Sequence, residues 1–273
     1  MTRFLSLVIC SLLFVAPATG QDSIDLMVDG VGLSIGDSKE VTGLRLNFRD
    51  RAMRRVTGIN ATIWLPYNNH GGDVHGIALG LPSTGADNIT GIGSALMAVA
   101  ANEDAKGIMF GGVAAGAGND LMGLAAGGLG VGAGRDIEGI VTGSLGAGAG
   151  RNLTGISIGG LGTGAGDTLR GLHIAGLGVG GTNVRGVMVS GLTAGGHDVY
   201  ALSIAPAYFS VDHGGKMRGL SVSSYNRIQG EQKGVTIGIL NYARKLSGYQ
   251  IGLINVASNK DRFRIMPFIN FAR

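Results

Sequence analysis

Histidines are the side chains of this chain best suited to chemistry, and only two of them lie close together. His70 and His75 flank Asp73 within a polar insertion. The other three are isolated in the sequence: His173, His197 and His213. A protein metal site needs three or four ligands. These histidines are therefore interpreted as polar loop residues, and the sequence predicts no metal site.

Other patterns that could serve catalysis also have structural explanations. Glycine strings such as Gly148 and Gly150 with Gly155 resemble phosphate loops, which need a strand before them and a helix after them. No stretch here shows useful helical periodicity, and the same glycines recur throughout the middle of the chain. There is no G-x-S-x-G nucleophile motif. The sequence predicts no catalytic residue, no cofactor and no enzyme activity.

A basic cluster lies near the N-terminus and consists of Arg45, Arg49, Arg51, Arg54 and Arg55. One interpretation is contact with anionic envelope material such as lipopolysaccharide or peptidoglycan. The other is a solvated polar cap, because terminal repeats must cover the open end of a stack. The capping requirement favours the second interpretation.

The chain is built from a repeat of 15 or 16 residues, with two spacings of 18. A fixed period of this kind predicts stacked structural units. Each unit opens at one of these residues: Gly43, Gly58, Gly76, Gly91, Gly107, Gly123, Gly139, Gly155, Gly171, Gly186, Ala201, Gly219, Gly234 and Gly248.

Each unit reads as two short strands joined by a corner. In the unit 123–138, Leu124 and Ala126 share one parity and Leu129 and Val131 share the other. An Asn or Asp turn closes each unit, followed by an apolar residue that is expected to point inward. Glycine and alanine predict a thin interior, in which backbone hydrogen bonds and a stack of Leu, Ile and Val provide stability.

Two all-β architectures fit these units. One is a glycine-rich parallel β-solenoid with one coil per unit, a rod roughly 60 Å long at about 4.8 Å per coil. The other is an antiparallel β-meander or outer-membrane β-barrel with one strand per unit. The shared turn sequence favours the solenoid, because a coil places every turn on the same edge.

The last units are near copies of each other, and Asn241, Asn255 and Asn270 occupy equivalent places in them. We expect these amides to form a ladder along the stack. The unit 248–255, GYQIGLIN, resembles bacterial exported surface-repeat proteins whose units read G-x-Q-I-G-L-x-N. The clear similarity covers 234–257 and the C-terminal FIN echo. The resemblance implies export, a surface or envelope location and no enzyme activity.

Residues 1–20 read as a secretory signal peptide, with Arg3 before an apolar run and small residues before Gln21. Its removal leaves 21 basic and 18 acidic residues and no cysteine, since Cys10 lies within it. That weak charge gives no reason to expect nucleic acid as a partner. The remaining regions are expected as an N-terminal strand or cap at 21–42, glycine-rich repeats at 43–233, and C-terminal repeats with a cap at 234–273.

Taken together, these patterns predict an exported, non-enzymatic envelope or surface repeat protein with a structural or partner-binding role. Its expected partner is an envelope or surface component, the outer membrane included. An outer-membrane barrel that forms a pore is the alternative.

Overall fold

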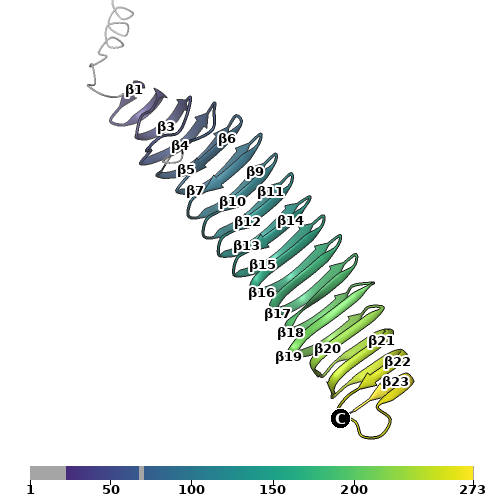
Figure 1. Ribbon diagram of the computed structural model, residues 1–273. Coiled ribbons are helices and arrows are strands. Elements are labelled where there is room, and N and C mark those ends of the chain that lie inside the picture. Colours follow the sequence, from purple (N-terminus) through teal and green to yellow (C-terminus); the bar gives the residue numbers. More distant parts are fainter. Residues whose placement is uncertain (1–22, 68–70, 273) are drawn as a thin grey trace, which may run out of the picture.

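The computed structural model describes residues 23–67 and 71–272, which form a rod of stacked β-strands (Figure 1). Strands about 16 residues apart pair in parallel, and the coil makes about 13 turns. This pairing confirms the parallel β-solenoid and shows that the meander or barrel alternative, which needs antiparallel neighbours, is wrong. The expected signal peptide lies outside the described residues, as does His70. No helix in the described part of the chain has the length and apolar character needed to cross a membrane.

The first coils contribute one longer strand each and the following coils, beginning at residue 73, add a shorter one; the two kinds of strand stack into separate rows of parallel pairs. The longer strands are β2 (Val31–Gly36), β3 (Glu40–Asn47), β4 (Arg55–Thr62), β5 (Asp73–Gly80), β7 (Asn88–Ala95), β9 (Ala105–Gly111), β11 (Leu121–Gly127), β13 (Asp136–Gly143) and β15 (Asn152–Gly159). The shorter ones are β6 (Ser83–Ala86), β8 (Ala98–Ala101), β10 (Ala114–Ala117), β12 (Gly130–Ala133) and β14 (Gly146–Ala149). We call these stacks the long and the short sheet.

Beyond residue 160 most strands continue through a corner of the coil. Four of them continue through the closing turn: β16 (Gly162–Ala175), β17 (Gly178–Ser190), β18 (Thr193–Ile204) and β19 (Tyr208–Val222). β20 (Tyr225–Gln232) remains a short-sheet strand, and β21 (Val235–Leu246) and β22 (Tyr249–Ala257) continue through the opposite corner. At the two ends of the rod the pairing becomes antiparallel: β1 (Ser23–Val28) pairs with β2, and β23 (Ile265–Phe271) pairs with β22.

The predicted coil-opening glycines lie in one register along the long sheet. Gly139, for example, has a φ of 140°, a region that L side chains rarely adopt. A Cβ there would lie 1.9 Å from the carbonyl oxygen of Gly123 in the preceding coil. Glycine is therefore required at this position, because the backbones of adjacent coils approach too closely for a side chain.

The apolar residue of each closing turn points inward, as predicted: Ile137 and Leu153 are fully buried. Val131 and Val141 also lie inside. Only part of the expected Leu, Ile and Val stack is internal, however. The residue after each coil-opening glycine faces outward, and Ile140 is 46% exposed. Much of the remaining interior is alanine and glycine, so the two sheets lie close together.

The Asn and Asp residues of the closing turns do not adopt a positive φ. Their side chains instead join successive coils. Asp136 Oδ1 accepts a hydrogen bond from the backbone N–H of Asn152 at 3.1 Å. Asp136 also pairs with Arg151, and this hydrogen bond is the main cause that lowers the pKa of the Asp136 carboxyl. This edge of the rod is polar and carries coil-to-coil ion pairs.

Candidate interaction surface

The histidines that sequence analysis considered are not brought together. Asp73 and His75 lie on β5, with His75 exposed on the outer side of the long sheet. His213 contacts Arg244 far from them. Among the described residues, no group of three or more His, Cys, Asp or Glu side chains is placed to hold a metal ion. The glycine string at 148–155 lies on β14, the following turn and β15, without the helix that a phosphate loop needs.

One serine–histidine pair occurs inside the rod. Ser157 Oγ lies 2.8 Å from His173 Nδ1 and 2.6 Å from Thr163 Oγ1. Such a pair can activate a serine nucleophile. Ser157 and His173 have no exposed surface, however, so a substrate cannot reach them. Burial lowers the pKa of His173 to about 4, which leaves the ring neutral at pH 7. The pair is therefore part of the packed interior of the rod and not a catalytic site.

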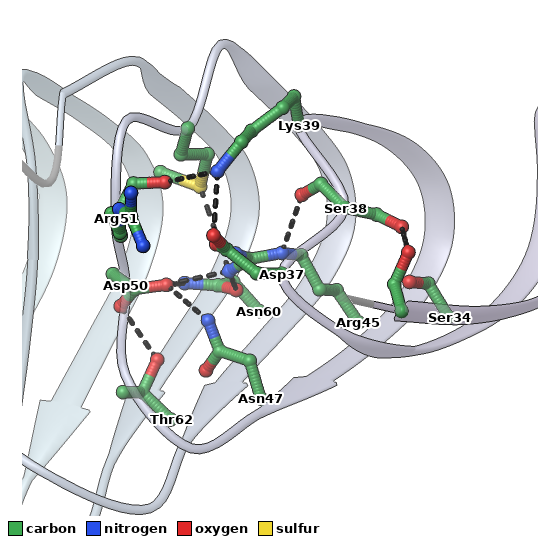
Figure 2. A network of polar contacts seen from close by, with 12 residues as sticks. Ser34, Asp37, Ser38, Lys39, Arg45, Asn47, Asp50, Arg51, Asn60 and Thr62 are labelled. Atoms are coloured by element: carbon green, nitrogen blue, oxygen red, sulfur yellow. Dashed lines mark hydrogen bonds and ion pairs between the residues drawn. The ribbon is translucent and has the colours of Figure 1, made fainter. Parts of the chain in front are cut away.

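The basic cluster is divided by the fold, and Arg45 is its buried member (Figure 2). Arg45 Nη1 donates to Asp50 Oδ1 at 2.5 Å and to Asn60 Oδ1 at 2.8 Å. Asp50 also accepts hydrogen bonds from Asn47 at 2.7 Å and from Thr62 at 2.6 Å. The expectation that Arg45 belongs to a solvated cap is wrong, because a fully bonded carboxylate lies inside the same coil.

The other members of the cluster lie at the surface. Arg49 Nε donates to the carbonyl of Leu65 at 2.8 Å, and Arg54 pairs with Glu40 at 3.2 Å. Arg51 and Arg55 are exposed. These four arginines fit the polar surface expected at a terminal coil.

The predicted amide ladder is confirmed for Asn241 and Asn255 and is wrong for Asn270. Asn226 Nδ2 donates to Asn241 Oδ1 at 2.8 Å, and Asn241 Nδ2 donates to Asn255 Oδ1 at 2.7 Å. Asn270 lies on the antiparallel strand β23 and accepts a hydrogen bond from Lys260 at 2.7 Å instead. The chain reversal before β23 breaks the register, and the third member of the ladder is Asn226.

Apolar side chains, some exposed and some half-buried, form a strip along the outer side of the long sheet. Its first row is formed by the residue after each coil-opening glycine, and every pair is in register. We call it the aliphatic row. Its members are Leu44, Ile59, Ile77, Ile92, Ile108, Leu124, Ile140, Ile156, Leu172, Val187, Leu202, Leu220 and Val235.

Two further rows lie beside it. Two residues along each strand, the second row is continuously aliphatic in the C-terminal half: Ile158, Ile174, Val189, Ile204, Val222, Ile237 and Ile251. The adjoining turn carries a third row, joined by backbone hydrogen bonds: Met97, Val113, Leu129, Leu145, Leu161, Leu177 and Leu192. We call the three rows together the apolar face.

The apolar face extends along most of the rod. About 13 turns at about 4.8 Å give a length of roughly 60 Å. Three neighbouring rows cover a width of roughly 12 Å, since alternate residues on a strand are about 6.6 Å apart. Because the second and third rows each extend along only about half of the rod, the three rows together occupy roughly 500 Å², comparable to the 300–600 Å² of the largest apolar patch on a typical monomer. Exposed apolar patches of this size are often functional.

Basic side chains border the apolar face in its C-terminal half. They lie two residues before the aliphatic row, on the same side of the strands: Arg170, Arg185, Arg218 and Lys233, with Tyr200 between the second and third. We call this the basic row. Arg170, Arg185 and Arg218 form no ion pair with another described residue, whereas Lys233 lies 3.4 Å from Glu231. The three arginines are therefore available to an anionic partner.

At its N-terminal end the apolar face is extended by a pair of aromatic side chains. Phe48 and Trp64 stack with ring centroids 6.3 Å apart. Beside them an open apolar groove of about 480 Å³ is lined by residues that include Leu46, Leu81 and Phe110. The sequence carried a signal for this face, because one aliphatic residue follows nearly every coil-opening glycine. Sequence analysis missed it by assigning part of that pattern to the core.

No protein-family model, curated protein sequence or solved structure matches the chain.

Proposed function

We propose that this chain is an exported, non-enzymatic repeat protein of a bacterial cell envelope or surface, and that it acts by binding a partner along the apolar face. The rows of outward-facing Ile, Leu and Val, many of them exposed, carry the proposal. The signal-like sequence at 1–20 and the surface-repeat resemblance at 234–257 support export.

The energetics of the apolar face favour a binding role. Covering roughly 500 Å² of apolar surface provides about 12 kcal/mol at about 25 cal/mol per Å². Association and the ordering of side chains offset a large part of this gain. The remainder still supports stable binding along a rigid rod, whose coils are already held in register by backbone hydrogen bonds.

Fractionation of a Gram-negative host that expresses the full chain tests this proposal. The row variant I158T/I174T removes two neighbouring apolar side chains, and threonine keeps the strand preference. The control variant L240T/I254T makes the same change at neighbouring positions of the short sheet. We expect the wild type and the control in the envelope fraction, and the row variant shifted severalfold toward the soluble fraction.

Mass spectrometry of the same material should find a mature N-terminus near Gln21. Intact Met1 in a cytosolic fraction would contradict export. Equal distribution of the row and control variants would contradict binding through the apolar face.

A further inference from the structure

We propose that the partner of the apolar face is an anionic lipid surface, on which the rod lies lengthwise. This inference rests on the proposed function and names the partner of the same surface. It follows from the position of the basic row beside the aliphatic rows in the C-terminal half of the rod.

The order of side chains across the long sheet matches the layers of a membrane surface. Along β16 the order is Arg170, then Leu172 two residues later, then Ile174 two residues after that. Along β17 the corresponding residues are Arg185, Val187 and Val189. Cationic groups beside an apolar strip are the features by which amphipathic segments bind anionic bilayers. The arginines would contact headgroups while the aliphatic rows enter the acyl boundary.

The charges near this strip favour an anionic partner. In the coils from 170 to 233 the basic row contains four cationic side chains and no acidic one. On the N-terminal side the row continues through Thr154 to Glu138. The polar edge of the rod differs, because its Arg135 and Arg151 are already paired with carboxylates one coil away. Electrostatic attraction to a bilayer is therefore concentrated where the two aliphatic rows are continuous.

The rigidity of the surface adds to this argument. The rows are fixed by the parallel register of the strands, so the side chains that meet the lipid need little ordering on binding. Tyr200 lies within the basic row with the Arg218 guanidinium 5.3 Å from its ring. An amphipathic tyrosine suits the headgroup level of a bilayer.

Co-sedimentation of the purified full chain with sucrose-loaded vesicles tests the inference. Vesicles of phosphatidylcholine with about 30% phosphatidylglycerol should bind at least tenfold more tightly than pure phosphatidylcholine. Binding should weaken from 50 to 500 mM NaCl, since salt screens exposed charges. R170Q/R185Q should bind anionic vesicles roughly 30-fold more weakly, because each cation near such a surface contributes about a factor of five.

Matched variants separate this effect from a general loss of charge or of fold. R135Q/R151Q removes two arginines one coil apart from the polar edge and should bind like the wild type. I158T/I174T should lose at least tenfold on both vesicle types, whereas L240T/I254T should not. Circular dichroism and thermal unfolding establish that all variants are folded before binding is compared.

Three outcomes would overturn the inference. The first is equal binding to neutral and anionic vesicles, and the second is an unchanged affinity of R170Q/R185Q. The third is a stable dimer in sedimentation velocity that I158T/I174T dissociates, with no vesicle binding by the wild type. In that third case the row-dependent envelope retention of the proposed function would still stand, and the partner would be a second copy of the chain.

Discussion

The middle and C-terminal coils share one backbone plan but fill their interiors with different chemistry. In the middle coils, the inward positions of the short sheet hold apolar residues such as Val131 and Ala147. In the last coils, the corresponding positions hold Asn226, Asn241 and Asn255, all fully buried. A repeat can therefore bury an amide in every coil, provided that each neighbouring coil supplies its partner.

The difference shows where each region gets its stability. In the middle coils the sheets are close and the side chains small, so the contact between backbones of adjacent coils dominates. In the last coils each amide also bonds a backbone carbonyl: Asn226 Nδ2 lies 3.1 Å from the Ile237 oxygen, and Asn241 Nδ2 lies 3.0 Å from the Ile251 oxygen. Substitutions in each of the two regions test these contributions separately.

The largest effect is expected from Gly139→Ala in the middle coils. Its φ of 140° disfavours alanine, and the added Cβ would lie 1.9 Å from a backbone oxygen. Strain and overpacking together should cost about 4 kcal/mol of unfolding free energy. The control is Gly132→Ala, where the nearest atom is 3.7 Å from the Cβ position and little change is expected. Urea unfolding measures both, and equal losses would contradict a backbone-dominated middle region.

The next effect is expected from Asn241→Leu in the C-terminal coils. This substitution removes the middle of the ladder, leaving Asn226 without one of its acceptors and Asn255 Oδ1 without its donor. At about 1–3 kcal/mol for each unsatisfied buried group, the loss should be about 3 kcal/mol. Asn255→Leu breaks only one link of the ladder and should cost less. If the two variants unfold at the same denaturant concentration, the number of broken ladder hydrogen bonds does not determine the loss of stability, which would contradict the prediction.

The smallest effect concerns the one buried histidine of the middle coils. His173 Nε2 has no hydrogen-bond partner among the described residues. Its pKa of about 4 lies below the usual 6.5, so the unfolded chain binds more protons between these values. Stability is therefore complete above about pH 6.5 and falls as the pH drops, with a loss of about 2 kcal/mol at pH 5.

The variant His173→Met provides the test, because Met188 occupies the equivalent place in the next coil. Thermal unfolding between pH 7 and pH 4 should show a weaker pH dependence in this variant than in the wild type. An identical pH dependence in the two proteins would show that His173 is not the group responsible.

Much of the fold could be predicted from the period alone. The coil-opening glycines at Gly43, Gly91 and Gly139 were assigned from spacing, and they lie in register because each backbone passes too close to its neighbour for a Cβ. The inward Ile137 was predicted for a similar reason, since the closing turn recurs on the same edge of every coil. The candidate binding surface was not predicted.

The sequence by itself determined the number and spacing of the coils, the positions that only glycine can occupy, and the link between Asn241 and Asn255. Beyond the closing turns, only the tertiary structure decided which side of each strand faces inward. Alternation separates residues into two sets without saying which set is buried, and here both sets are apolar. The structure also decided the burial of Arg45, whose partners are Asp50 in the same coil and Asn60 in the next, and the reversal that removes Asn270 from the ladder, because both depend on contacts that form only in the folded chain.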